Sequence, residues 1–267
     1  MSGPSADAGR LADRVVVVTG GGSGIGAAIA RACAAHGARV AVADRDADAA
    51  RAVAGDVGAA ALPVVADVTD RASVARGLDL VVETFGRLDV VFNNAGVNTP
   101  MRFLDVTEEN FRRVLEVNAL GVLIGTQEAA RRFPARGPGG RAVRGKVVNT
   151  ASIAGRTGFP DFAPYSASKA AVISLTQSAA RALAADGVTV NAFSPGVVAT
   201  PLWRQLDADL TAIGAADAGF DSMAGDILLG RPAEPADIAP TAVYLASADS
   251  DYMTGQVVAI DGGMVLV

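Results

Sequence analysis

The sequence predicts an α/β fold: a doubly wound parallel sheet of about seven strands, with helices on both faces and a small lid insertion. Three observations predict it. Short β-branched runs alternate with longer alanine-rich segments, a glycine-rich turn follows the first run, and an aspartate follows each of the next two. Strand–helix alternation is typical of parallel sheets, because the chain must cross over between parallel neighbours. Such sheets bind ligands at the carboxyl ends of their strands.

The first strand is expected over residues 14–19, where four consecutive valines precede a glycine run. A continuous apolar run is typical of a strand that is buried on both faces. Two later strands end in an aspartate, Asp44 and Asp67. The six further runs of this kind span residues 40–43, 62–65, 90–92, 146–149, 188–193 and 257–260.

Long helices are expected over residues 25–35, 107–133 and 164–185. The first closes near Gly37, and the second opens on Thr107, whose hydroxyl can cap a helix. The third opens with Pro164, which suits a first turn, and stops before Asp186 and Gly187.

The domain organisation is expected to be simple. We interpret residues 13–267 as one Rossmann-type domain and residues 1–12 as a flexible N-terminal tail, since the chain shows no repeat and no linker. Residues 135–145 are expected to form a surface loop. Residues 200–229 have a weak helical pattern and follow a strand end, which is the place for a lid.

Composition excludes several classes of function. The chain has 267 residues and a net charge of −5, which argues against nucleic acid or an anionic membrane as a partner. No apolar run approaches the ~20 residues that span a bilayer. One cysteine and one histidine cannot form an internal disulfide or a His/Cys metal cluster, so we expect no metal. A cytoplasmic protein is the plain interpretation.

The turn from Thr19 to Gly26 carries the first functional signal. Its glycines let the backbone approach a pyrophosphate, and the helix that follows offers free N–H groups. Asp44 lies eighteen residues beyond Gly26, where a carboxylate can accept hydrogen bonds from both ribose hydroxyls of an adenosine. It would repel a 2′-phosphate, so NAD is favoured over NADP. The neighbouring Arg45 could tolerate that phosphate and leaves the strictness of the preference open.

Tyr165 and Lys169 carry the second signal. Only two lysines stand against twenty-one arginines in this chain, and one of them lies four residues after a tyrosine. At this spacing the two side chains share a helix face. A free phenol has a pKa near ~10. A neighbouring ammonium, with a positively charged nicotinamide nearby, should lower it, so that the tyrosine can exchange a proton near neutral pH.

These motifs together resemble the classical short-chain dehydrogenase/reductase family, over essentially the whole chain after the first dozen residues. The matching motifs are Thr-Gly-x-x-x-Gly-x-Gly at 19–26, Asp67-Val68, Asn93-Asn94-Ala95-Gly96, Asn118, Ser152, Tyr165-x-x-x-Lys169 and Pro195-Gly196-x-x-x-Thr200. The scaffold segments are most similar to acetoin reductase/2,3-butanediol dehydrogenase members and to sorbitol-type polyol dehydrogenases.

The resemblance implies a role for each matching residue. Tyr165 would be the general acid/base, Lys169 would hold the nicotinamide ribose, Ser152 the substrate oxygen, and Asn118 a water relay to the lysine. The implied cofactor-binding residues are Gly20, Ser23, Gly24, Ile25, Gly26, Asp44, Arg45, Asp67, Val68, Asn94, Ala95, Gly96, Tyr165, Lys169, Pro195, Gly196, Val198 and Thr200. The expected substrate residues are Ser152, Phe159, Tyr165, Leu202 and Trp203. The family's habit of association implies a homotetramer.

The leading hypothesis is an NAD(H)-dependent oxidoreductase that interconverts a secondary alcohol and its ketone, the substrate being a small diol, hydroxyketone or polyol. An NADPH-dependent 3-ketoacyl-thioester reductase is the alternative within this class, and Asp44 counts against it. A Rossmann methyltransferase would leave Tyr165 and Lys169 without a role. A non-catalytic nucleotide sensor would not need the four catalytic side chains.

Overall fold

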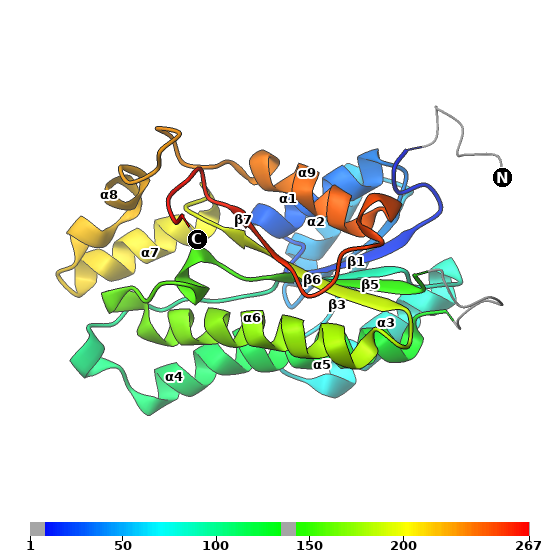
Figure 1. Cartoon of the computed structure of the whole chain (residues 1–267), viewed down its shortest axis with the longest axis horizontal. Helices are drawn as coiled ribbons and strands as arrows, with labels where there is room; N and C mark the ends of the chain where they lie inside the picture. The colour runs from blue at the N-terminus through cyan, green and yellow to red at the C-terminus, as the bar shows by residue number, and fades with distance from the viewer. Residues whose placement is uncertain (1–8, 135–142, 267) are drawn as a thin grey trace.

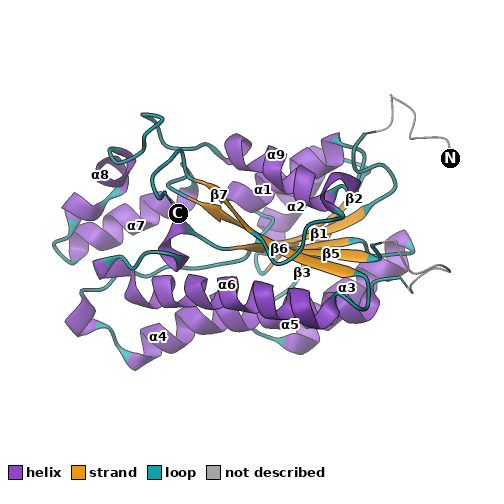
Figure 2. Ribbon diagram, in the orientation of Figure 1, coloured by secondary structure: helices purple, strands orange, loops and turns teal. Residues whose placement is uncertain are grey.

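Seven parallel strands form one sheet at the centre of the protein (Figures 1 and 2). The computed structural model describes residues 9–134 and 143–266. The sheet has the order β3-β2-β1-β4-β5-β6-β7, so the direction of winding reverses between β1 and β4. The strands are β1 (Val15–Thr19), β2 (Arg39–Asp44), β3 (Ala61–Val65), β4 (Val90–Asn93), β5 (Gly145–Thr150), β6 (Val188–Pro195) and β7 (Val257–Ile260). The predicted fold class is confirmed, and the strand bounds differ from the prediction by no more than two residues.

Two apolar cores hold helices to the two faces of the sheet. Along β1, Val16 and Val18 face one core and Val15 and Val17 face the other, as the two-residue period of a strand requires. The first core receives α1 (Gly24–Ala35), α2 (Ala47–Val57) and α9 (Pro235–Ala246), and the second receives α3 (Arg71–Phe85), α5 (Gly121–Arg132) and α6 (Ala163–Leu183). Figure 1 shows these two groups above and below the sheet. The continuous valine runs are therefore explained by burial on both sides.

The helix predicted over residues 107–133 has an interruption that the sequence did not indicate. It begins as α4 (Glu108–Leu115), with the Thr107 hydroxyl accepting a hydrogen bond from the Asn110 N–H. A single π-helical turn, η2 (Glu116–Leu120), follows and leads into α5. Such turns are rare and occur frequently at functional sites.

The prediction of a flexible N-terminal tail is wrong for the last residues of that segment. Leu11 is fully buried in the first core, and its N–H donates to the His36 carbonyl at 2.9 Å. Arg10 forms an ion pair with Asp249. Residues 1–8, the remainder of the expected tail, and 135–142, most of the expected loop, lie outside the described residues. The loop prediction is also wrong at Gly145, which is the first residue of β5. A Cβ on Gly145 would lie 2.2 Å from the Phe133 ring, so glycine allows this ring to pack against the strand.

The predicted lid is more helical than its sequence pattern indicated. It contains α7 (Pro201–Ala212), the turn η5 (Ala216–Ala218) and α8 (Phe220–Ala224), and it lies beyond the end of the sheet (Figure 1). Leu210 and Ala215 are fully buried against Phe162. A backbone bridge between Val198 and Ala233 closes the base of the insertion. The lid thus has its own small core, apart from the two cores that cover the sheet.

The described residues contain no helix that is long and apolar enough to cross a membrane. Across residues 9–134 and 143–266, no three His, Cys, Asp or Glu side chains are grouped so that they could hold a metal ion.

Asp89 organises the amino-terminal edge of the sheet. Its buried carboxylate accepts hydrogen bonds from the Val15 N–H at 2.9 Å and from two nitrogens of Arg87. Its backbone joins β1 and β5, because its N–H donates to the Val15 carbonyl and its carbonyl accepts from the Lys146 N–H. These contacts therefore indicate a structural role for Asp89.

We expect Asp89→Ala to lower the free energy of unfolding by about 3 kcal/mol, because it leaves the buried Val15 N–H and the arginine charge unpaired. Urea denaturation measures the loss, with Asp105→Ala, at an exposed position, as the control that should change it by less than about 0.5 kcal/mol. A loss below about 1 kcal/mol for Asp89→Ala would contradict this role.

Candidate active site

The glycine turn between β1 and α1 forms the floor of a cleft. Gly20 and Gly24 have φ values of +61° and +50°, which disfavour other residues. A Cβ on Gly26 would lie 2.1 Å from the Gly20 carbonyl oxygen, so this glycine lets the helix pack onto the turn. The first turn of α1 has no acidic residue, and the Ser23 side chain caps no N–H group. The helix therefore presents its positive end to the cleft, as an anion site requires.

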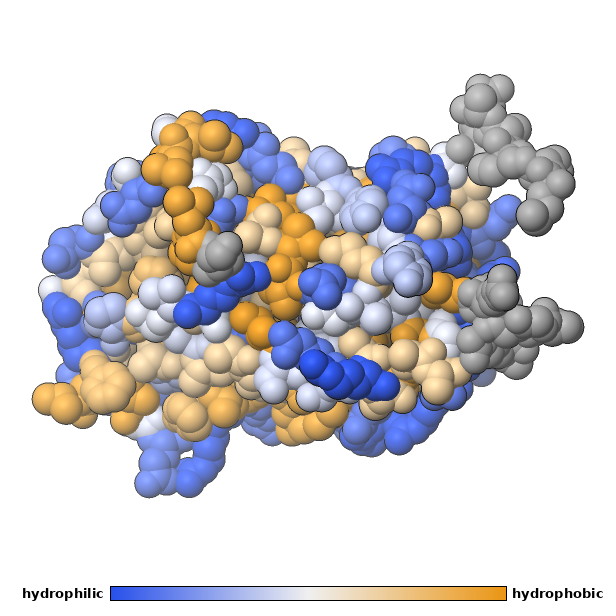
Figure 3. All heavy atoms as spheres, viewed as in Figure 1, coloured by the Kyte–Doolittle hydropathy of each residue, from blue (hydrophilic) through white to orange (hydrophobic). Residues whose placement is uncertain are grey.

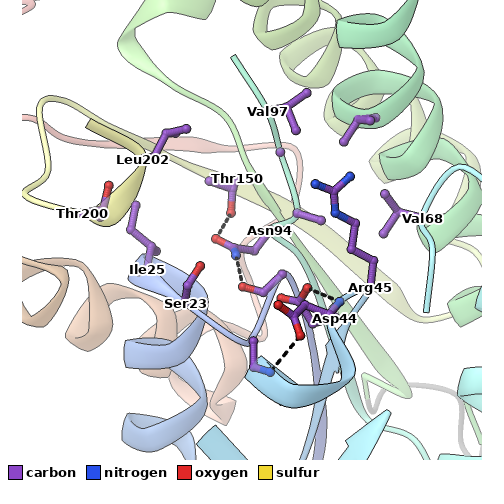
Figure 4. Close-up of a pocket in the computed structure, with 18 of the residues that line it drawn as sticks. Ser23, Ile25, Asp44, Arg45, Val68, Asn94, Val97, Thr150, Thr200 and Leu202 are labelled. Carbon is purple, nitrogen blue, oxygen red and sulfur yellow. Dashed lines mark hydrogen bonds between the residues drawn. The ribbon is translucent and has the colours of Figure 1, made fainter. Parts of the chain in front are cut away.

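Asp44 lies at the carboxyl end of β2 and is already oriented. One carboxylate oxygen accepts from the Gly22 N–H and the other from the Asp46 N–H, both at 3.0 Å. A Cβ on Gly22 would lie 2.9 Å from this carboxylate, so only glycine fits between the turn and β2. Figure 4 shows Asp44 and Arg45 on the side of the cleft opposite Thr200 and Leu202.

Asp67 and Val68 follow β3 and form the next part of the wall. The Asp67 carboxylate accepts hydrogen bonds from the N–H and the hydroxyl of Thr69, at 2.9 and 2.7 Å. These two bonds are the main reason that the pKa of Asp67 is lowered, and the charge of Arg45 adds a smaller effect.

Asn94 connects three strand ends beneath the cleft. Its amide donates to the Thr19 carbonyl at 3.0 Å. Its oxygen accepts from the Thr150 hydroxyl at 3.2 Å (Figure 4). Its own N–H donates to the Thr19 hydroxyl at 2.9 Å. The ends of β1, β4 and β5 are therefore held together by side chains as well as by the sheet.

Asn118 lies in the π turn η2 and is fully buried. Its amide accepts from the Val97 N–H and donates to the Val97 carbonyl, both at 2.8 Å. It also donates to the Ser168 hydroxyl at 3.0 Å, and that hydroxyl donates to the Tyr165 carbonyl at 2.7 Å. Asn118 thus connects the segment after β4 to the helix that carries Tyr165.

Tyr165, Lys169 and Ser152 come together where β5 ends and α6 begins. The Lys169 ammonium is buried and donates to the Thr150 carbonyl at 2.7 Å. It lies 5.5 Å from the centre of the Tyr165 ring. The Tyr165 phenol forms a hydrogen bond with Ser152, whose hydroxyl also accepts from the Ala154 N–H. The predicted i, i+4 pair therefore does share one helix face.

The predicted lowering of the Tyr165 pKa requires a positively charged nicotinamide as well as Lys169, and in the protein alone burial has the larger effect. Burial raises the pKa of Tyr165, and the hydrogen bond with Ser152 opposes the rise. Burial also lowers the pKa of Lys169, to about 8. Both shifts have one cause, since removing water disfavours the charged form of either group.

The cleft has a volume of about 570 Å³ and is lined by most of the predicted cofactor-binding residues. The predicted residues on its wall are Gly20, Ser23, Gly24, Ile25, Gly26, Asp44, Arg45, Asp67, Val68, Asn94, Ala95, Gly96, Tyr165, Lys169, Thr200 and Leu202. Pro195, Gly196, Val198, Asn118 and Ser152 do not line it. Gly196 packs against Asp261, and Val198 is buried in the bridge to Ala233.

Two of the expected substrate residues lie outside the lining of this cleft. Phe159 and Trp203 belong to a row of aromatic rings that does not line this cleft. Trp203 lies between Phe162 and Phe220, with ring centres 6.5 and 5.5 Å away. In α7, Leu202 faces the cleft and the neighbouring Trp203 packs in the lid core.

Sequence reasoning missed two contributors to the site. Thr150 supplies the carbonyl that holds Lys169, and Ser168 lies between Asn118 and the backbone of Tyr165. The position of Thr150 at the end of β5 was a usable signal, because ligands bind at strand ends. Ser168, one residue before the lysine, had no such signal.

Comparisons with known proteins agree with this geometry. A family model described as enoyl-(acyl carrier protein) reductase matches residues 20–265. The chain is 42% identical to L-2,3-butanediol dehydrogenase of Corynebacterium glutamicum, covering 94% of this chain and 98% of that protein. It is 41% identical to galactitol 2-dehydrogenase of Agrobacterium fabrum, covering 95% and 98%.

A solved structure has the same fold. It is the 3-ketoacyl-(acyl-carrier-protein) reductase from Brucella melitensis complexed with NADH, with a TM-score of 0.85 and 34% identity over 96% of this chain and 100% of that one. The family model, these relatives and the shared motifs identify the chain as a member of the short-chain dehydrogenase/reductase family.

Proposed function

We propose that this protein is an NAD(H)-dependent oxidoreductase that interconverts a secondary alcohol and its ketone, with Tyr165 as general acid/base. The observation that carries the proposal is the position of the Tyr165 phenol, which bonds to Ser152 at a cleft built on a glycine turn. Family membership leaves no place for the methyltransferase alternative. A non-catalytic sensor would have no use for the buried Lys169 beside that phenol.

The residues present fit a dinucleotide. The glycine turn, where Cβ atoms would clash at Gly22 and Gly26, leaves room for a pyrophosphate at the start of α1. Asp44 would accept the adenosine ribose hydroxyls, and Asp67 and Val68 would border the adenine. Lys169 would donate to the nicotinamide ribose. When bound, NAD(H) supplies the hydride acceptor or donor.

The proton follows a path through the chain's own side chains. For reduction, the Tyr165 phenol donates its proton to the carbonyl oxygen, while Ser152 donates a hydrogen bond to the same oxygen. For oxidation, the phenolate takes the proton from the alcohol. Because burial raises the pKa of Tyr165, the phenol stays protonated near neutral pH in the protein alone. Its ionisation for oxidation therefore needs a higher pH or a nearby positive charge.

Two observations support the substrate class. Val97 and Leu202 give the cleft an apolar side, which suits a small or moderately hydrophobic alcohol or ketone better than a phosphorylated sugar. The similarity to a butanediol and a galactitol dehydrogenase supports a small diol, hydroxyketone or polyol. A 3-ketoacyl-thioester reductase is the second candidate, favoured by the similarity to the Brucella melitensis reductase. That structure holds NADH, so NAD preference alone does not separate the two. A substrate screen that includes both classes does.

Self-association into a homotetramer in the cytoplasm completes the proposal. Several large apolar side chains are exposed, among them Phe103, Leu104, Leu228 and Leu229. Figure 3 shows apolar surface at the end of the molecule that carries the lid. Exposed apolar surface of this kind supports association. Light scattering with size-exclusion chromatography measures the assembly.

We expect Tyr165→Phe to lower kcat at least about 100-fold, because the reaction loses its proton donor and acceptor. NADH binding, followed by nicotinamide fluorescence, should stay within about threefold of wild type, since the ring remains. The control is Tyr252→Phe, at a fully exposed tyrosine. Turnover of acetoin or 2,3-butanediol by Tyr165→Phe at the wild-type rate would eliminate the proposed role.

We expect Asp44→Ala to weaken NADH binding about tenfold or more, through the loss of charged hydrogen bonds to the ribose. NADPH binding should improve relative to NADH, because the repulsion of its 2′-phosphate is gone. The control is Asp48→Ala, a nearby exposed aspartate paired with Arg51. If the ratio of the two dissociation constants does not change, the preference belongs to Arg45 or another group.

A further inference from the structure

Arg102 lies on the loop between β4 and α4 and connects segments that are distant in sequence. Its Nε donates to the Ile213 carbonyl at 3.2 Å and its Nη2 to the Gly214 carbonyl at 2.6 Å. Its Nη1 donates to the Asp161 carboxylate at 3.4 Å. About half of the Arg102 side chain is exposed, whereas that of Asp161 is 10% exposed. The guanidinium thus uses all three of its nitrogens.

The two carbonyls belong to Ile213, the C-cap residue of the lid helix α7, and to Gly214, the residue directly after it. The last carbonyls of a helix lack partners within the helix, and they carry the negative end of its dipole. A guanidinium there supplies both hydrogen bonds and opposite charge. At the other end of α7, the N-cap residue Thr200 lies beside the glycine turn, where a Cβ on Gly24 would come within 3.4 Å of its side chain. Leu202 lies between these two ends, on the cleft wall.

Asp161 belongs to the short turn η4 (Pro160–Phe162), which leads directly into α6 and Tyr165. Its carbonyl accepts from the Met101 N–H at 3.0 Å, so the loop holds it through two adjacent residues. In the same turn, Phe162 meets Trp203 of α7 edge to face, at an interplanar angle of 79°. The turn before Tyr165 therefore contacts the lid through one polar and one aromatic connection.

We propose that Arg102 is a positioning residue that fixes the lid helix α7 against the turn preceding Tyr165, and so sets the affinity for the alcohol or ketone. The part about substrate rests on the proposed function; the part about the lid does not. Arginine suits this role because its planar fork can serve three acceptors at once, which a lysine ammonium on a flexible stem cannot. Arg102 touches neither the glycine turn nor Asp44, so nucleotide affinity should depend on it less than substrate affinity does.

Trp203 makes the lid directly observable. It is the single tryptophan of the chain, so intrinsic fluorescence reports on α7 without a label. Acrylamide quenching of the free enzyme measures how accessible the ring is. The variants are Arg102→Ala and Arg102→Lys, together with Asp161→Asn, which removes the charge but keeps the shape. The control is Arg112→Ala, an exposed arginine of α4 paired only within its helix, with Glu108.

We expect Arg102→Ala to raise the Trp203 quenching constant at least about twofold. Without Arg102, α7 should separate more often from the turn that precedes Tyr165, and this exposes the tryptophan ring. The KM of this variant for the alcohol or ketone should rise about tenfold, with kcat within about threefold of wild type. This result is expected when the variant loses binding energy that is equal for the substrate and the transition state. The NADH dissociation constant should stay within about threefold of wild type. Arg102→Lys and Asp161→Asn should fall between wild type and Arg102→Ala, and Arg112→Ala should match wild type.

An unchanged quenching constant in Arg102→Ala and Asp161→Asn would overturn the proposal, as would an unchanged KM in an active variant. If wild type turns over none of the tested alcohols, the proposed function fails, and the quenching series still decides whether Arg102 holds the lid.

Discussion

The site depends on the burial of the Lys169 ammonium at the end of β5, where it donates to the Thr150 carbonyl at 2.7 Å. This bond fixes α6 to the sheet, and it occurs in a place where burial lowers the lysine pKa to about 8. Thr150 is joined through Asn94 to the glycine turn, so one frame carries both the cleft floor and Tyr165. A Cβ on the nearby Gly96 would lie 3.3 Å from the Asn118 amide oxygen, which is a tight approach.

Burial also determines the chemistry of Tyr165. Burial raises the phenol pKa and lowers the lysine pKa, so the charged form of each group is less stable in the protein alone than it is in water. A protonated phenol suits ketone reduction near neutral pH. Alcohol oxidation requires the phenolate, which a positively charged nicotinamide would stabilise. The direction of catalysis should therefore respond to pH and to the state of the cofactor.

Much of the fold could be predicted from the sequence, because valine runs buried on two faces and a glycine turn at a strand end are local patterns. The π turn around Asn118 could not be predicted, since its residues fit ordinary helical periodicity. Nor could the role of Thr150, which acts through a main-chain carbonyl that has no side-chain signature. The different surroundings of two adjacent lid residues could not be predicted either. Leu202 lines the cleft, whereas Trp203 packs against Phe162.

The most direct test is kcat/KM against pH in both directions, with one alcohol–ketone pair and the wild-type enzyme. A single group that takes and returns the proton predicts one apparent pKa in each direction, and the value should be lower for oxidation, where the positively charged nicotinamide stabilises the phenolate. Oxidation should rise with pH up to its apparent pKa and then level off, whereas reduction should stay constant up to its apparent pKa and then fall. An apparent pKa that is higher for oxidation than for reduction, or oxidation that slows as pH rises towards its apparent pKa, would contradict the assignment of both proton transfers to Tyr165.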